Sequence, residues 1–110
     1  VDLAAFDPAA VPRERVEKLR LAWSITTRSR VILHAARMTR LKGHHVVVEA
    51  LARLKAQDRL GDAVVVFAGD HRGREAYVRE LEQLIEERKL WGHARIVGHC
   101  ADVPAALAAA

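Results

Sequence analysis

Three short apolar runs, separated by amphipathic stretches, constrain the fold of this chain more than any other feature. They are "VILHAA" (31–36), "AVVVFAG" (63–69) and "ARIVG" (94–98), and they contain the β-branched residues typical of buried strands. The second run is apolar throughout, which is characteristic of a strand covered on both faces. The sequence therefore predicts three strands, each followed by a connection long enough for a helix.

The stretches after the runs predict helices. Apolar residues recur there at the helical spacing: Val47, Ala50, Leu51 and Leu54 in the first stretch, and Tyr77, Leu81, Leu84 and Ile85 in the second. A Glu75/Arg79 pair supports the second helix, and Asp102 is the predicted N-cap of a third, with Pro104 in its first turn. This alternation predicts an α/β fold with a parallel sheet and flanking helices, whose functional groups lie at the carboxyl ends of the strands.

Composition excludes several classes of protein. With 51% hydrophobic and 29% charged residues, the chain is typical of a soluble globular domain. Its longest uncharged stretches, such as "VPAALAAA", fall far short of the roughly 20 apolar residues that span a bilayer. The opening "VDLAAFDPAAV" carries two acids and no basic region, unlike a signal peptide, and the single Cys100 fits a reducing compartment. These features predict a cytoplasmic location.

Positive charge is concentrated in one part of the chain. Residues 13–42 contain nine Lys and Arg but only two acids, whereas the net charge of the whole chain is +4. A local excess of this kind indicates a local anion partner. For residues 13–30 the alternative is a solvated, Arg-rich helix face. Nucleic-acid binding is disfavoured, because aromatic residues make up only 5% of the chain and none is interleaved with these cations.

The segment "ARMTRLKGHHVVV" (36–48) places Arg37, Arg40 and Lys42 in the turn between the first strand and the first helix. Free backbone N–H groups and the helix dipole favour an anion in such a turn, and an Arg fork with a Lys point charge favours phosphate. The segment lacks the earlier glycine of a P-loop, and the chain contains no G-x-G-x-x-G. The residues alone therefore predict a site for a diphosphate or a similar anion.

The other conspicuous side chains have structural explanations. His44 and His45 are adjacent, so they point in different directions on a helix and are expected to be polar residues of its first turn rather than metal ligands. His34, within the first strand, is expected to be a core or strand-end histidine. Trp23 and Trp91 are expected to be packing residues. No metal site is predicted.

Four segments, "VDLAAFDP", "HAARMTRLKGHHVVVEAL", "VVVFAGD" and "ARIVGHCADVPAALAAA", resemble in order and spacing the group 1 retaining glycosyltransferases of the glycogen-synthase and sucrose-synthase-like class. The resemblance spans nearly the whole chain. It implies a GT-B architecture, in which this chain is the first half of the C-terminal, donor-binding domain, with a Rossmann-like parallel sheet and flanking helices. Residues 1–30 would be a segment and helix leading into the domain, and residues 31–110 a partial nucleotide-sugar-binding domain.

The resemblance also implies a donor site. In the family, an Arg and a Lys five residues apart bind the diphosphate of the donor, and these fall on Arg37 and Lys42. Arg40 lies outside the match and is expected to be solvated. The loops expected to border the donor contain Gly69, Asp70, Gly98 and His99. One departure is Ala36, where the family usually has glycine. A pair of family glutamates that contacts the donor would fall beyond Ala110, together with the second half of the sheet.

The function that the resemblance implies is donor binding, with a UDP- or GDP-sugar as substrate, for transfer of a sugar to a glycan, lipid or small-molecule acceptor in polysaccharide biosynthesis. No catalytic residue, metal or cofactor is expected in this chain, which would be inactive without the acceptor-binding domain. Peripheral membrane association of the parent enzyme is compatible with the resemblance. An exposed sheet edge predicts self-association of the isolated chain. The alternative is a non-catalytic α/β module that binds a phosphorylated ligand or a protein partner.

Overall fold

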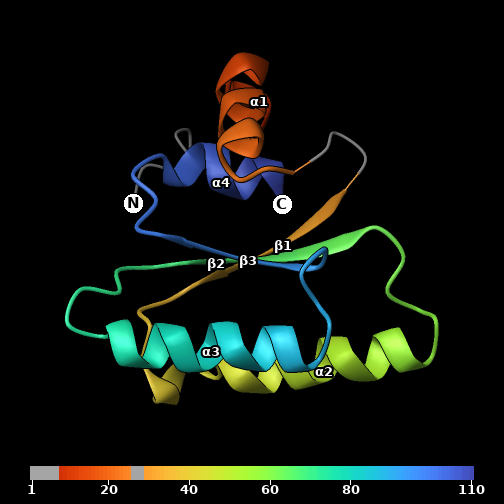
Figure 1. Ribbon diagram of the computed structural model, residues 1–110. Coiled ribbons are helices and arrows are strands. Elements are labelled where there is room, and N and C mark those ends of the chain that lie inside the picture. The colour runs from red at the N-terminus through yellow and green to blue at the C-terminus, as the bar shows by residue number, and fades with distance from the viewer. Residues whose placement is uncertain (1–7, 26–28) are drawn as a thin grey trace.

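The computed structural model describes residues 8–25 and 29–110, so most of the opening segment "VDLAAFDP" lies outside the described residues (Figure 1). Strands and helices alternate along the chain as predicted. In order, the elements are the 3-10 helix η2 (Pro8–Ala10), α1 (Arg13–Ala22), β1 (Arg30–Ala35), the 3-10 helix η3 (Arg40–Lys42), α2 (His44–Ala56), β2 (Ala63–Ala68), α3 (Glu75–Glu87), β3 (Ala94–Gly98) and α4 (Val103–Ala109).

The three strands form one parallel sheet in the order β1-β2-β3, which confirms the predicted fold class. Ile32 lies opposite Val65 in one pair, and Val66 lies opposite Arg95 in the other. Every residue of the central strand β2 is buried, as its continuous apolar character predicts. All three strands run in the same direction, so their carboxyl ends meet at one edge of the sheet.

Two helical layers cover the sheet (Figure 1). Helices α2 and α3 lie on one face, and α1 and α4 lie on the other. Because side chains alternate along a strand, β2 supplies both cores: Val65 and Phe67 pack in the cluster under α2 and α3, whereas Val64 and Val66 pack in the cluster that contains Trp23. The sheet is thus held between two apolar layers, as the sequence pattern requires.

Helix α1 is tied to the sheet and to α4 by arginines as well as by packing. The Arg15 guanidinium pairs with the Asp102 carboxylate, and Arg20 donates to the carbonyl oxygens of Ser29 (2.7 Å) and Ala109 (3.1 Å). Arg13 and Arg30 also form ion pairs, with Glu17 and Asp62, so four members of the basic stretch have partners within the chain. Asp102 is the N-cap of α4, as predicted, because its side chain accepts from the Ala105 N–H. The hydrogen bond from Arg15 is the main cause that lowers the pKa of Asp102. The domain boundary at residue 30 stays a prediction.

The buried face of α2 differs from the predicted one. His44, Val48 and Leu51 are its buried residues, whereas Ala50 is exposed and Val47 is only partly buried. The helix begins at His44, so the spacing i, i+4, i+7 from that residue points inward, and His44 is 0% exposed instead of a polar first-turn residue. The centroid of its ring lies 4.5 Å from the ring centroid of His34 and 5.4 Å from that of Phe67.

The two tryptophans differ in their surroundings. Trp23 is buried in the cluster beneath α1 and α4, which confirms its packing role. Trp91 is 57% exposed and lies outside the core, so the prediction that it is a packing residue is wrong. It follows α3 in the turn that leads to β3, where Leu90 already fills the core position. Within the described residues, no helix has the length and apolar character needed to cross a bilayer.

The buried imidazole of His44 predicts a pH-dependent stability. Burial is the main cause that lowers its pKa below the ordinary value of 6.5, so below that pH the unfolded chain binds more protons than the folded one. The free energy of unfolding should therefore fall as the pH is lowered through 6.5 and below, by at most about 1.4 kcal/mol per pH unit for one proton. Urea unfolding from pH 5 to 8 measures this slope. His44→Phe should reduce it, and the control His45→Gln should not; equal slopes in all three proteins would contradict the assignment.

The outer edge of β1 is where we expect the predicted self-association to occur. Within residues 8–25 and 29–110, β1 pairs with β2 only, and Ile32 in this strand is 50% exposed. Light scattering at high concentration should give a mass above 12.2 kDa, and Ile32→Lys should lower it, because a charge on an edge strand opposes pairing. Val46→Lys, a similar change on the exposed face of α2, is the control. A monomeric wild-type chain would contradict the prediction.

Candidate functional site

The segments that follow the three strands are tied together by backbone hydrogen bonds. Ala36 N–H donates to the Ala68 carbonyl (3.0 Å), and Met38 N–H donates to the Asp70 carbonyl (3.3 Å). The third strand joins through the Gly69 N–H, which donates to the Gly98 carbonyl at 2.7 Å. The residues predicted from the ends of three separate strands therefore lie at one edge of the sheet.

Gly69 is required by the close approach of two backbones. A Cβ atom built at this position would lie 1.8 Å from the Ala36 carbonyl oxygen, so no other residue fits without movement of the chain. Gly98 has φ +73°, and a Cβ there would lie 3.1 Å from Cε1 of His71. Both predicted glycines thus shape the edge of the sheet, and direct contact with a ligand stays a prediction for each.

A first cleft lies across these strand ends, and we name it the strand-end cleft. Its volume is about 290 Å³. Its lining is mostly apolar and consists of Leu33, Ala35, Ala36, Arg37, Ala68, Gly69, Asp70, His99, Cys100, Val103 and Ala106. Four of the six predicted site residues, Arg37, Gly69, Asp70 and His99, are therefore brought together here, and Lys42 and Gly98 do not line this cleft.

A second cleft adjoins the first at Arg37, and we name it the basic cleft. It measures about 490 Å³ and is lined by Arg37, Met38, Thr39, Leu41, Lys42, Arg74 and Tyr77. Arg37 and Lys42 therefore share one surface, as the spacing of the motif predicts. No carboxylate lines the cleft, and no ion pair of Arg37, Lys42 or Arg74 is found in the part of the chain that the structure describes. The side chain of Arg40 lies outside the described part, so its solvation stays a prediction.

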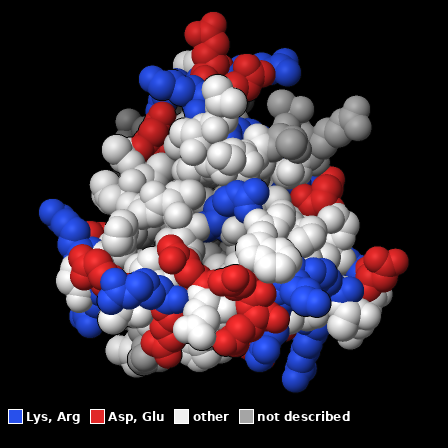
Figure 2. Space-filling view, viewed as in Figure 1, with Lys and Arg blue, Asp and Glu red and all other residues white. Residues whose placement is uncertain are grey.

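Arg74 was missed by sequence analysis. It lies more than 30 residues beyond Lys42 and immediately precedes α3, so only the fold brings the two together. The available signal was its position in the loop after the second strand, at the functional edge of a parallel sheet. Figure 2 shows acidic and basic side chains intermixed over the α2–α3 layer on the face in view. The acid-free lining of the basic cleft therefore differs from the surface of that layer.

Two histidines lie next to the loop that carries Arg37 and Lys42, and one of them bonds to it. His34 Nε2 lies 2.9 Å from the Lys42 carbonyl oxygen, and because a carbonyl only accepts, this nitrogen carries the hydrogen. His44 Nδ1 lies 3.4 Å from the hydroxyl of Tyr77, which also lines the basic cleft. Gly43, with φ +73°, lets the chain turn from the loop into α2. His34 thus ties the loop to β1, and the contact between His44 and Tyr77 ties the start of α2 to α3.

Asp70 is a paired carboxylate. Its oxygens accept from the guanidinium and the backbone N–H of Arg72, and the hydrogen bond from the Arg72 side chain is the main cause that lowers the pKa of Asp70 to about 2. The carboxyl group is therefore ionised at neutral pH and poorly suited to general acid–base chemistry. Cys100, in the same cleft, has a pKa raised by burial. Within the described ranges, 8–25 and 29–110, no group of three His, Cys, Asp or Glu residues could hold a metal ion.

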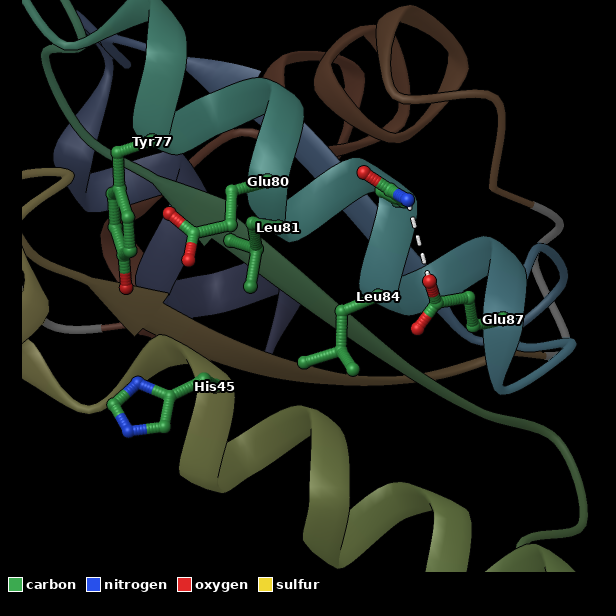
Figure 3. A pocket seen from close by; sticks show the side chains of 7 residues that line it. His45, Tyr77, Glu80, Leu81, Leu84 and Glu87 are labelled. Atoms are coloured by element: carbon green, nitrogen blue, oxygen red, sulfur yellow. Dashed lines mark hydrogen bonds between the residues drawn. The ribbon is translucent and has the colours of Figure 1, made fainter.

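A third hollow of about 350 Å³ lies between α2 and α3 (Figure 3). Its lining includes Tyr77, Leu81, His45, Glu80 and Glu87. Figure 3 shows His45 across from the side chains of α3, and a hydrogen bond joins Gln83 to Glu87 on that helix. The carboxylates make this hollow unsuitable for a phosphate, in contrast to the basic cleft.

The fold and the edge of the sheet define the chain as a Rossmann-like α/β region with a basic loop after its first strand. Comparison with known proteins identifies its family. Residues 16–110 match the family of glycosyl transferases group 1, and the chain belongs to that family. This confirms the resemblance carried by the sequence motifs.

Individual relatives agree with the family. The chain is 37% identical over 99 residues to D-inositol 3-phosphate glycosyltransferase of Jonesia denitrificans, covering 88% of this chain and 23% of that protein. A glycosyltransferase from Rickettsia africae superimposes with a TM-score of 0.86 at 31% identity, over 96% of this chain and 27% of the other. The structure of Anabaena Alr3699/HepE in complex with UDP and glucose superimposes with a TM-score of 0.79 at 26% identity, over 99% of this chain and 28% of the other. This chain spans about a quarter of the length of these proteins.

The bond from His34 to the Lys42 carbonyl predicts a positioning role. His34→Leu should weaken binding of inorganic pyrophosphate about fivefold, the equivalent of one hydrogen bond of roughly 1 kcal/mol. His34→Gln, whose side-chain amide can donate in place of Nε2, should restore it. The control is His93→Leu. His93 immediately precedes β3, and its Nδ1 bonds to the Ala63 carbonyl (2.8 Å) away from both clefts. Titration followed by NMR measures the affinities; equal losses in both leucine variants would indicate general destabilisation instead.

Proposed function

We propose that this chain binds a nucleotide diphosphate sugar, as the donor-binding part of a retaining hexosyltransferase. The observation that supports the proposal most directly is the position of Arg37, which lines both clefts. The diphosphate would lie against Arg37 and Lys42, and the nucleoside would extend into the mostly apolar strand-end cleft. UDP is the first nucleotide to test, because HepE was solved with UDP and with UDP-glucose, and GDP is the second.

The chemistry asked of these residues is electrostatic. When the bond between the sugar carbon and the terminal phosphate oxygen breaks, the electron pair stays on that oxygen, and the negative charge of the diphosphate grows. Preorganised cations that face the developing charge stabilise it. Arg37 offers a planar fork that matches phosphate oxygens, and Lys42 offers a point charge. We expect no metal and no cofactor to be needed for this role.

The remaining parts of the reaction belong to the whole enzyme. Because the chain spans about a quarter of the length of its relatives, turnover is proposed for the complete protein and not for this region alone. The acceptor is proposed to be a glycan, a lipid or a small molecule, and the enzyme is proposed to act in the cytoplasm in the assembly of polysaccharides or glycolipids. Asp70, which is ionised and paired with Arg72, has no proposed role as an acid or base.

A second candidate is a non-catalytic module that binds a simple phosphorylated ligand. The basic cleft supports it, because three cations with no carboxylate in the lining could hold inorganic phosphate without any contribution from the strand-end cleft. The two candidates differ in the role of the nucleoside. A nucleotide-sugar site requires the strand-end cleft, whereas a phosphate site does not.

NMR titration of the chain with UDP, GDP, uridine and inorganic phosphate tests the proposal. UDP or GDP should bind more tightly than inorganic phosphate, and Arg37→Ala and Lys42→Ala should each weaken it about tenfold, the loss of one charge-assisted hydrogen bond of roughly 1.5 kcal/mol. Arg53→Ala, which removes an exposed cation from the body of α2, is the matched control and should bind normally. Amides of residues 98–102 should shift with UDP and not with phosphate.

Two results would contradict the proposal. Equal affinity for UDP and inorganic phosphate, with no shift at the strand-end cleft, would favour the simple phosphate module. Failure of UDP and GDP to bind, or binding unaffected by removal of Arg37 and Lys42, would show that the basic cleft is not a donor site.

A further inference from the structure

We propose that Arg74 is the third cation of the diphosphate site and that it favours the free nucleoside diphosphate over the nucleotide sugar. The inference rests on the proposed function and deepens it, because it assigns a role to a residue outside the Arg-Lys motif. It would make the site a better binder of the departing nucleotide than of the intact donor.

The placement of Arg74 follows from the loop between β2 and α3. Its N–H donates to the His71 carbonyl (2.8 Å), and its own carbonyl accepts from the Val78 N–H (3.0 Å), so the backbone is fixed on both sides. Gly73, with φ +76°, makes the turn that precedes it. The side chain lines the basic cleft with Arg37 and Lys42. Arg74 is therefore a cation on a defined backbone at the edge of the proposed diphosphate site.

The neighbouring acids do not neutralise Arg74. Asp70 is paired with Arg72 and lines the other cleft. The Glu75 carboxylate accepts from the Gly73 N–H at 3.1 Å, and backbone hydrogen bonds are the main cause that lowers the pKa of Glu75. Neither carboxylate lines the basic cleft. Three like charges in one acid-free cleft repel one another, and a bound polyanion would relieve that repulsion.

The selectivity follows from the charge of the ligand. In a nucleotide sugar each phosphate of the diphosphate carries one negative charge. In the free nucleoside diphosphate the terminal phosphate gains nearly one more, since the second pKa of a phosphate monoester is about 6. Two cations, Arg37 and Lys42, match the charge of the intact donor. The third cation matches the additional charge, which is present only after the sugar has gone.

The test compares UDP with UDP-glucose in NMR titrations of the 110-residue chain at pH 7.5. Arg74→Ala should weaken UDP about fivefold and UDP-glucose less than about twofold, the range expected for one exposed charge contact. Arg74→Lys, which keeps the charge, should retain much of the preference. The matched control is Arg79→Ala, the same change of charge on α3 at a residue that does not line the basic cleft, and it should alter neither affinity.

A pH series gives an independent readout. Lowering the pH to about 5 protonates the terminal phosphate of UDP, so the preference of the wild-type chain for UDP over UDP-glucose should shrink. In Arg74→Ala the preference should already be small and change little with pH. A structural defect caused by the substitution would not produce this difference, and amide spectra of the variants show directly whether each is folded.

The outcomes separate this inference from the proposed function. If Arg37→Ala and Lys42→Ala lose both ligands but Arg74→Ala loses neither, the donor site stands and the role of Arg74 is wrong. Equal loss of UDP and UDP-glucose in Arg74→Ala would overturn the selectivity. If the wild-type chain binds neither ligand, the proposed function and this inference both fail.

Discussion

The contact on which the rest of the structure depends is the backbone-to-backbone approach at the carboxyl edge of the sheet. The carbonyl of Ala36 lies where the Cβ of any residue other than glycine at position 69 would stand, and Gly69 in turn donates to the Gly98 carbonyl. This approach ties the loops after the three strands into one surface. Without it, Arg37 would still follow β1, but it would have no fixed relation to Asp70 or His99. Gly69, in the turn after β2, thus allows the loops that carry the predicted site residues to lie against one another.

The two clefts have complementary chemistry because they form on different parts of that edge. The strand-end cleft is bordered by small apolar residues of β1, β2 and α4, and the basic cleft by the loop before α2 and the residue before α3. Arg37 belongs to both. A ligand with one charged and one planar, less polar part could therefore contact both surfaces, whereas a simple anion would use only one. The third hollow, between α2 and α3, presents carboxylates and illustrates that not every concave surface here suits a phosphate.

Local sequence patterns predicted the elements well, because strands and helices depend on the spacing of apolar residues within a few turns. The three strands and the positions of Arg37 and Lys42 follow from such patterns and from the rule that parallel strands end together. Other features depend on contacts between distant segments. Arg74 joins the cleft only because the fold brings the start of α3 beside the loop after β1. His44 is buried because its ring packs against those of His34, Phe67 and Tyr77. Trp91 is exposed because Leu90 already occupies the core position, which periodicity alone does not reveal.

The burial of His44 shows how the loop and the core depend on each other. An apolar residue at the start of α2 would pack without the cost of desolvating a ring nitrogen. The imidazole instead contacts the rings of His34, Phe67 and Tyr77, and its Nδ1 lies 3.4 Å from the Tyr77 hydroxyl. Tyr77 lines the basic cleft, and His34 holds the carbonyl of Lys42. The aromatic cluster therefore touches the loop that carries Arg37 and Lys42, and its polar atoms help to fix that loop at some cost in stability.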